Sequence, residues 1–292
     1  MKKTLLIIGI VILAIGGIVL GLSIAKHSEK SVKNEYTIDE SFSNLDIDVT
    51  TSEVTFIKTN EAKAKVVLDE KEKEYHTVEV KDGTLEIKKV NTKKWFEYIF
   101  KLNFSRMKVT VYLPLSAYQN VKINSSTGNI KIPNDFSFGN VTISVSTGNV
   151  SFEAKTSGDF AVSASTGKVT LNKANIGGAA TISVSTGNIE LTEVKAKSLD
   201  ISASTGKVTL TKTIVTDLTK IKTSTGDVLF TDSDSGSLNV KTSTGSVRGT
   251  LLTAKIFSAK SDTGKASVPK TTTGGQCIIE TGTGDIIIKL TE

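Results

Sequence analysis

The chain has 292 residues, of which 38% are hydrophobic and 23% are charged, and its formal net charge is +6 at pH 7. This composition excludes a disordered tail and a many-pass membrane protein. Because the chain has one cysteine (Cys277) and two histidines (His27 and His76), it can form neither an internal disulfide nor a Cys/His zinc cluster. The mild positive charge suits a weakly anionic partner, such as a membrane or a cell-wall polymer, without requiring one.

The first segment, residues 1–25, predicts a membrane anchor. Thr4 to Ala25 carries no charge, and these 22 residues would form about 33 Å of helix, enough to cross a bilayer. Lys2 and Lys3 place the N-terminus in the cytoplasm, although the lysines that follow the run weaken this orientation. The alternative is a signal peptide cleaved after Ala25, but the apolar run is longer than a usual signal core, which favours a retained anchor. Either way, the predicted location is the cell membrane, with a single pass and an extracytoplasmic body.

A Thr-Gly pair recurs nine times in residues 121–292, at intervals of 19 or 20 residues. Internal repetition of this length is typical of repeat architectures, and glycine supplies the positive φ that a tight turn needs. The predicted turn glycines are Gly128, Gly148, Gly167, Gly187, Gly206, Gly226, Gly245, Gly264 and Gly284.

Apolar residues stand at fixed offsets from these glycines. Every residue five before the glycine and two after it is apolar, as Ile123 and Ile130 illustrate, while the residues between are mostly polar. This alternation predicts two strands per repeat with one buried face. A second, looser turn is predicted between units, at pairs such as Gly177-Gly178 and Gly274-Gly275. Because equivalent residues recur at equal offsets, like-on-like stacking is favoured over antiparallel hairpins, and the sequence predicts an all-β solenoid. At about 4.8 Å per coil, nine coils would form a rod of roughly 43 Å, with the threonines aligned along one edge.

The same pattern, with alternating apolar residues on both sides of a turn, continues upstream in weaker form. We call this pattern the template. It can be placed around Ser52 and around Gly83, so residues 36–120 are predicted to be irregular coils with insertions that cap the solenoid. Residues 26–35 are polar and without periodicity, and are predicted to be a linker.

The stretch from Asn91 to Phe104 concentrates aromatic residues beside lysines. Trp95, Phe96 and Tyr98 are candidate contacts with a membrane or a partner, because such side chains suit a headgroup interface. In the other interpretation, which we favour, these aromatics pack over the open end of the coil.

The sequence offers no catalytic, cofactor-binding or metal-binding motif. His27 and His76 have no nucleophile motif near them, and Cys277 stands at an offset that is otherwise mostly apolar, which predicts a buried core residue. Phosphate-loop and dinucleotide motifs are absent, so no cofactor is predicted. Nucleic-acid binding is not expected either, because the basic residues are not clustered and the body is predicted to be extracytoplasmic.

Carboxylates were considered because some β-solenoids cleave polysaccharides with clustered acids. Asp227 and Asp285 follow turn glycines three coils apart in the sequence, too far for joint catalysis. Asp232 and Asp234 lie in a serine-rich stretch, where we expect a solvated turn in preference to a Ca²⁺ site.

The repeat segments VTISVSTGNVSFE and LDISASTGKVTL resemble the bacterial putative-adhesin domain family, and VTVYLPLSAYQNVKINSSTGNI is similar to the usual lead-in of that family. The resemblance covers residues 36 to 290 and implies a surface β-solenoid of unknown biochemical activity, with no catalytic residues to carry over. Together with the predicted span, the whole chain resembles LiaG-type membrane-anchored proteins, which accompany cell-envelope stress systems of Gram-positive bacteria.

The sequence therefore predicts a non-enzymatic, membrane-anchored β-solenoid that contacts envelope polymers or proteins. The alternative is an accessory protein of an envelope stress response that acts on membrane sensor proteins, and a polysaccharide-active enzyme is less favoured. Self-association through the terminal coil is also expected, because the apolar run Ile286 to Ile288 would end the solenoid with an open strand edge.

Overall fold

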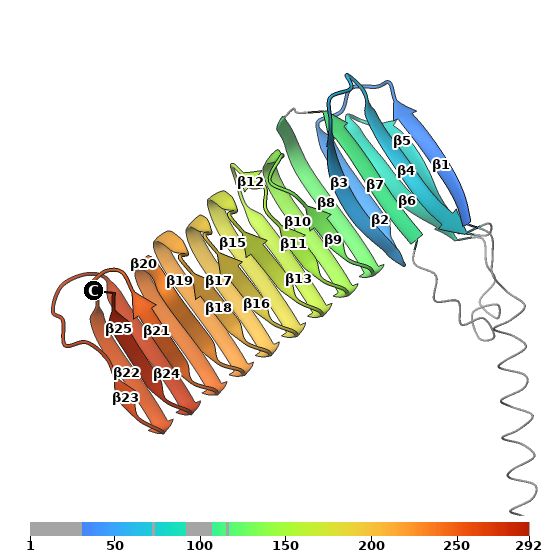
Figure 1. Cartoon of the computed structure of the whole chain (residues 1–292). Coiled ribbons are helices and arrows are strands. Elements are labelled where there is room, and N and C mark those ends of the chain that lie inside the picture. The colour runs from blue at the N-terminus through green and yellow to red at the C-terminus, as the bar shows by residue number, and fades with distance from the viewer. Residues whose placement is uncertain (1–30, 72–73, 92–106, 115–116, 292) are drawn as a thin grey trace, which may run out of the picture.

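The computed structural model describes residues 31–71, 74–91, 107–114 and 117–291, which form a rod of stacked rungs (Figure 1). The predicted anchor, residues 1–25, and the candidate contacts Trp95, Phe96 and Tyr98 lie outside these residues. The described residues include no helix with both the length and the apolar character that a membrane crossing demands.

Each rung of the solenoid contains a long strand, a glycine corner and a shorter strand, and both strands pair in parallel with the next rung. The long strands are β8 (Ala117–Thr127), β10 (Ser137–Thr147), β13 (Phe160–Thr166), β15 (Asn175–Thr186), β17 (Lys195–Thr205), β19 (Ile214–Thr225), β22 (Ile256–Thr263) and β24 (Gln276–Thr283). The shorter strands are β9 (Ile130–Ile132), β11 (Val150–Phe152), β14 (Val169–Asn172), β16 (Ile189–Thr192), β18 (Val208–Thr211), β21 (Val247–Leu251), β23 (Ala266–Ser267) and β25 (Ile286–Leu290). β12 (Lys155–Thr156) is a separate short segment, and β20 (Val228–Thr244) combines the short strand of one rung with the long strand of the next.

The glycine corners align along one edge of the rod, as the repeat predicted. Thr127 pairs with Thr147, which pairs with Thr166, and the threonines continue in register along the solenoid. All nine predicted turn glycines have positive φ, and each backbone lies close to the neighbouring corner: a Cβ added to Gly187 would lie 1.9 Å from the Gly167 carbonyl oxygen. The stacked β-solenoid is thereby confirmed, and the corner requires glycine both for its φ and for this close approach.

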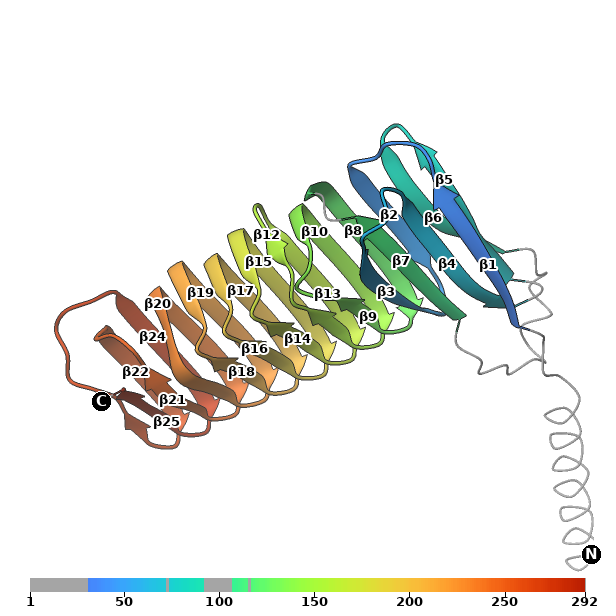
Figure 2. The same ribbon diagram turned by 45° about the horizontal axis from the view of Figure 1, so that its top comes forward.

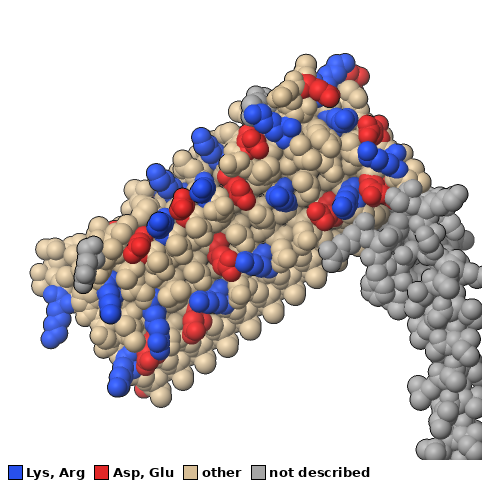
Figure 3. All heavy atoms as spheres, in the orientation of Figure 1, with Lys and Arg blue, Asp and Glu red and all other residues tan. Residues whose placement is uncertain are grey.

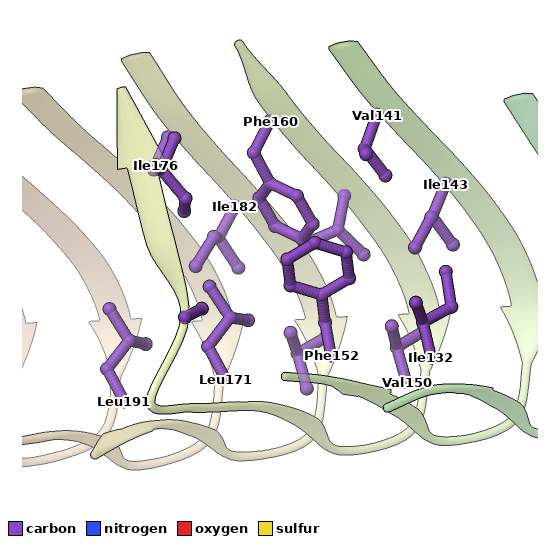
Figure 4. Packing of buried hydrophobic residues seen from close by; sticks show 14 of the residues in the cluster. Ile132, Val141, Ile143, Val150, Phe152, Phe160, Leu171, Ile176, Ile182 and Leu191 are labelled. Carbon is purple, nitrogen blue, oxygen red and sulfur yellow. The ribbon is translucent and has the colours of Figure 1, made fainter. Parts of the chain in front are cut away.

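The core runs the length of the rod between the long and short strands. Apolar side chains from equivalent positions stack rung on rung: Ile143 and Ile182 belong to one column, and Leu171 and Leu191 belong to another (Figure 4). Phe152 and Phe160 point toward each other across this core, with ring centroids 4.6 Å apart. Burying each such aromatic side chain removes a large apolar area from water, so these columns provide the main stabilisation of the fold.

A second corner, which contains no glycine, follows each short strand in the middle of the rod. Lys173, Glu193, Lys212 and Asp232 occupy it with φ between 46° and 54°. The turn predicted between units lies further along, at pairs such as Gly177-Gly178 within β15, where the chain bends and the register with β17 shifts between Ile176 and Ala179. Each of these rungs therefore has three sides instead of two: the short strand, the part of the long strand before this shift, which we call the third side, and the part that leads to the glycine corner.

Replacing Lys212 by glycine should stabilise the protein. Lys212 is exposed and has a φ of 49°, a left-handed conformation that L-residues other than glycine adopt at a cost. We expect the free energy of unfolding to rise by about 0.5–1 kcal/mol, because relief of this strain outweighs the added chain entropy. Denaturant unfolding would measure it, with Lys207→Gly as the matched control: Lys207 is also exposed but has no positive φ, so that variant should be destabilised.

The N-terminal region begins with a rung of the same kind. β2 (Asn44–Val49) and β3 (Ser52–Thr59) stack on β8 and β9, so that Leu45 pairs with Val121 and Val54 with Ile130. The placement of the template around Ser52 is confirmed. On the other side of this rung lie β6 (Thr84–Asn91) and β7 (Met107–Pro114), again in parallel.

Antiparallel strands close this end of the rod (Figures 1 and 2). They are β1 (Ser31–Ile38), β4 (Ala64–Lys71) and β5 (Glu74–Lys81). Gly83 lies in the turn between β5 and β6, which pair in antiparallel fashion, so the prediction of a solenoid corner there is wrong. β1 begins at Ser31, and the second half of the segment predicted as a linker is therefore part of this strand.

At the C-terminal end, the spatial order of the rungs differs from their order in the sequence. β24 and β25, the last strands of the chain, lie between the rung of β20 and β21 and the rung of β22 and β23. The sequence suggested that the run from Ile286 to Ile288 ends the solenoid, and this prediction is wrong. Another rung lies outside the run, and Ile286 and Ile288 are buried. The outermost rung is that of β22 and β23, where Ala259 and Ala266 take the place of larger apolar residues and Ala266 is exposed.

One column of charged side chains agrees with this order. Four residues before the corner glycine, consecutive rungs carry Lys222, Lys241 and Lys260, and the last rung in the sequence carries Glu280. In the structure Glu280 stands between Lys241 and Lys260, and its Oε2 lies 2.9 Å from the Lys241 Nζ. Sequential stacking would place Lys260 directly beside Lys241, as Lys222 already is. Glu280 between Lys241 and Lys260 therefore removes one of two like-charge neighbours, a small effect for exposed side chains.

Candidate functional site

Exposed serine and threonine side chains form two continuous columns beside the glycine corners. We call these columns the hydroxyl face; its threonines immediately precede the corner glycines, and its serines precede the threonines. All the serines of this face are exposed: Ser126, Ser146, Ser165, Ser185, Ser204, Ser224 and Ser243. Because the rungs are in register, the hydroxyls repeat at about 4.8 Å along the rod. The result is a regular array of hydrogen-bond donors and acceptors.

On the face of the rod seen in Figure 3, charged side chains of both signs are interspersed. Exposed ion pairs join neighbouring rungs, such as Lys220 with Asp200 and Arg248 with Asp285. Pairs of this kind contribute little to stability, about 0–1 kcal/mol each. Because these charges alternate in sign, the hydroxyl face is the surface feature that repeats the same chemical group over the largest number of rungs.

A cavity of about 470 Å³ lies near the C-terminal end, outside the third side of the rungs. Its lining residues come from three rungs and from the segment that leads into β24: Ile214, Val215, Asp234, Ser235, Gly236, Thr253, Ala254, Lys255, Thr273, Gly274 and Gly275. Thr271 Oγ1 donates a hydrogen bond to the Lys255 carbonyl oxygen and holds this segment against the body. A Cβ on Gly275 would lie 1.6 Å from the Gly236 carbonyl oxygen, so the close approach of the two backbones depends on glycine.

A lysine and an aspartate form a covered ion pair in this cavity. Lys255 Nζ lies 2.7 Å from Asp234 Oδ1, and their side chains are 4% and 14% exposed. The same Nζ donates to Thr253 Oγ1, and the Ser235 backbone N–H donates to Asp234 Oδ1. Asp234 belongs to an outward-facing column whose earlier members, Lys195 and Ile214, are exposed. The backbone around Lys255 and the segment from Thr273 to Gly275 therefore cover the pair and shield it from solvent.

The carboxylates considered from the sequence do not form a catalytic pair. Asp232 lies at the second corner and is partly exposed; its Oδ1 accepts hydrogen bonds from Thr250 Oγ1 and Thr291 Oγ1, both at 3.0 Å. Asp234 pairs with Lys255, which leaves the two aspartates with different partners and no shared cation site. The changed rung order brings Asp285 closer to Asp227 than the sequence predicted, but the Ser246 rung still separates them.

Cys277 is fully buried, which confirms the prediction of a core residue. Burial raises the pKa of its thiol to about 12, against a smaller opposite influence from the Lys255 charge. We expect Cys277 to be unreactive toward a disulfide reagent at pH 8, because the thiolate is the nucleophile and is scarce below the raised pKa. A colorimetric thiol assay would check this, and the same assay in denaturant should titrate one thiol; rapid labelling of the folded protein would contradict the assignment.

His76 is also buried, at the capped end of the rod. Its Nδ1 lies 2.8 Å from Glu70 Oε1, and the other oxygen of Glu70 accepts a hydrogen bond from Asn34 Nδ2 at 2.8 Å. Both side chains are almost completely buried, so the pair joins β1, β4 and β5 as part of the cap. No group of three or more His, Cys, Asp or Glu residues suited to a metal ion occurs in the described part of the chain.

The described residues thus present two features that can bind. The hydroxyl face was foreseen through the Thr-Gly repeat, whereas the cavity was missed, because its polar pair comes from positions that are 21 residues apart and form no motif. The nearest signal in the sequence was the acidic, serine-rich stretch around Asp234.

Comparison with known proteins gives a family and a set of similar folds. The family model described as Toastrack DUF4097 matches residues 42–288. A structure described as a "putative adhesin" from Bacteroides fragilis is 17% identical with a TM-score of 0.53, covering 90% of this chain and 98% of that one. A "putative lipid binding protein" from Parabacteroides distasonis is 16% identical with a TM-score of 0.54, and the coverage is again 90% and 98%. At these identities the likeness shows the fold alone. None of the curated proteins matches the chain.

Proposed function

The chain belongs to the Toastrack DUF4097 family, and from this premise we propose that it is a non-enzymatic envelope protein that makes weak, multivalent contacts through its hydroxyl face. The partner is an envelope polymer that lies along the rod. The structural relatives described as adhesins are consistent with such contacts.

The observation that carries the proposal is the alignment of exposed hydroxyls from rung to rung. Ser165, Ser185 and Ser204 are exposed on consecutive rungs, next to exposed threonines. A single hydroxyl contact contributes little net free energy in water, about 1 kcal/mol. Repetition changes this, because a polymer held at one rung meets the next at a high effective concentration. A rigid rod with a repeat of about 4.8 Å fits an extended chain better than a compact ligand.

The proposal includes a membrane anchor and an extracytoplasmic body. The uncharged run from Thr4 to Ala25 supports the anchor, and the polar hydroxyl face suits a body that meets the envelope. In this arrangement the capped N-terminal end is nearest the membrane in sequence, and the repeats extend away from it.

Co-sedimentation with isolated cell envelopes tests the proposal. Replacing Ser165, Ser185 and Ser204 by glutamate should reduce the bound fraction by about tenfold, since the face then loses hydroxyls and gains three charges. The matched control replaces Ser151, Thr170 and Thr209, on the outer side of the short strands, by glutamate. Equal binding of both variants would refute the hydroxyl face as the contact surface.

A further inference from the structure

We propose that the cavity around Lys255 and Asp234 binds a neutral sugar unit. The inference rests on the proposed function, since it names a site at which one unit of an envelope polymer would be held. The evidence for the inference comes from the cavity near the C-terminal end, however, and does not involve the hydroxyl face.

The polar atoms of the pair offer one donor and one acceptor side by side. A lysine ammonium has three N–H donors, and its contacts with the described residues use two, to Asp234 Oδ1 and Thr253 Oγ1. Asp234 Oδ1 is occupied by Lys255 and the Ser235 N–H, while Oδ2 accepts no hydrogen bond from any described residue. Neighbouring hydroxyls of a sugar ring can donate to such a carboxylate oxygen and accept from such an ammonium group.

The charges select an uncharged ligand. Lys255 and Asp234 neutralise each other at 2.7 Å, so an anionic ligand would be repelled by the carboxylate and a cationic ligand by the ammonium group. Hydrogen bonds to charged groups are also stronger than those between neutral groups. A neutral polyhydroxylated molecule gains these bonds without leaving either charge unpaired.

The remaining walls suit the less polar side of a sugar ring. Ile214 and Val215 supply an apolar wall, and Ile214 is 37% exposed where the equivalent residue of the preceding rung is Lys195. The volume of about 470 Å³ lies within the range of small-molecule sites, about 300–1,000 Å³. An apolar wall facing a few placed polar groups is the usual composition of such sites.

The cover over Lys255 and Asp234 sets this pair apart from the exposed lysine–carboxylate pairs of the rod. Pairs removed from water lose much of their Coulombic gain to desolvation, and apolar replacements of similar volume are often as stable. Exposed pairs elsewhere on the rod, such as Lys220 with Asp200, do without cover. The segment from Thr271 to Gly275 closes over Asp234 and Lys255 and forms the cavity at the same time.

Binding of sugar probes to the full chain tests the proposal. Saturation-transfer NMR and calorimetry with methyl glucoside and N-acetylglucosamine as neutral probes should detect binding to the wild type, with glucuronate and glucosamine as the charged comparisons. Lys255→Met should weaken binding of the neutral probes by about tenfold or more, as loss of a charged hydrogen bond predicts. Thr273→Trp should have the same effect by filling the cavity, and since Thr273 is exposed this variant keeps its folding contacts.

The outcomes separate this inference from the proposed function. The variant with three glutamates on the hydroxyl face should bind the neutral probes like the wild type, and Thr273→Trp should still co-sediment with envelopes in part. Absence of binding by either neutral probe, unchanged binding in Thr273→Trp, or tighter binding of a charged probe would each overturn the neutral sugar site. None of these results would affect co-sedimentation through the hydroxyl face.

Discussion

Replacing Gly187 by alanine is expected to lower the free energy of unfolding by about 4 kcal/mol, the sum of backbone strain and overpacking. The φ of Gly187 is +147°, which L side chains rarely adopt, and the added Cβ would lie 1.9 Å from the Gly167 carbonyl oxygen. That oxygen belongs to the backbone of the next rung, so relief requires the two rungs to separate. Because each rung of a solenoid contacts only its neighbours, the damage should divide the rod at this corner. Denaturant unfolding and hydrogen exchange would measure the loss and its position.

Two controls make this prediction specific. Gly83→Ala changes a glycine with a φ of +69° that has no atom within 4 Å of the added Cβ, so only the backbone cost of about 1 kcal/mol should appear. Ser185→Ala removes an exposed hydroxyl two residues from the corner and should change stability by less than about 0.5 kcal/mol. If Gly187→Ala were no worse than Gly83→Ala, close stacking of the corners could not be what stabilises the rungs.

The regular part of the fold could be predicted because two signals coincide at each repeat. Alternation on both sides of the glycine fixes which face is buried, and equal offsets fix the register, as the pairing of Ile143 with Ile123 and Val162 shows. A shift of one residue would turn every apolar side chain to the solvent. Few other arrangements of these residues satisfy both conditions.

The second corner could not be read from the sequence because it uses ordinary residues in a left-handed conformation. Lys173, Glu193 and Lys212 carry no mark of positive φ, and their backbone N–H groups are fixed by neighbouring rungs: the Lys173 N–H donates to the Thr192 carbonyl. Stacking imposes this conformation, which is tertiary information. The glycine pairs that suggested a turn lie where the long strand bends, and they also allow a close approach between rungs, as Gly178 does with Gly158.

The cavity escaped prediction for a related reason. After Leu251 the chain leaves the third side of the rung and passes through Lys255; after the outermost rung it returns through Gly274 and Gly275. Lys255 and Asp234 meet only because of this path. Nothing in the spacing of an isolated lysine and aspartate indicates this path. The hydroxyl face, by contrast, follows from the repeat itself, and so the sequence contained one candidate site and not the other.

The order of the last rungs was hidden because the apolar columns do not distinguish neighbours. Ile279 and Ala259 occupy the same column, and either can stack on Val240. The charges four residues before the glycine contain only a weak signal: a glutamate between Lys241 and Lys260 separates two like charges, while Lys222 and Lys241 stay adjacent.

Engineered disulfides should report this order directly. In a Cys277→Ala background, cysteines at positions 241 and 280 are expected to cross-link almost completely under mild oxidation. These residues are paired in neighbouring strands, which lie about 4.8 Å apart, within the Cα separation of about 4.4–6.8 Å that a disulfide allows. Cysteines at 260 and 280 should also cross-link, because these positions are paired as well. Non-reducing gels with peptide mapping would detect both bonds.

The matched control joins rungs that are consecutive in sequence but not in space. Cysteines at 241 and 260 stand two rungs apart, about 9.6 Å, which is too far for a disulfide without movement of the backbone. Sequential stacking would reverse the result, with ready cross-linking of 241 to 260 and none of 241 to 280. The same experiment bears on self-association, which stays a prediction: with β24 and β25 held inside the rod, the exposed edge of β22 is the surface through which two copies would meet.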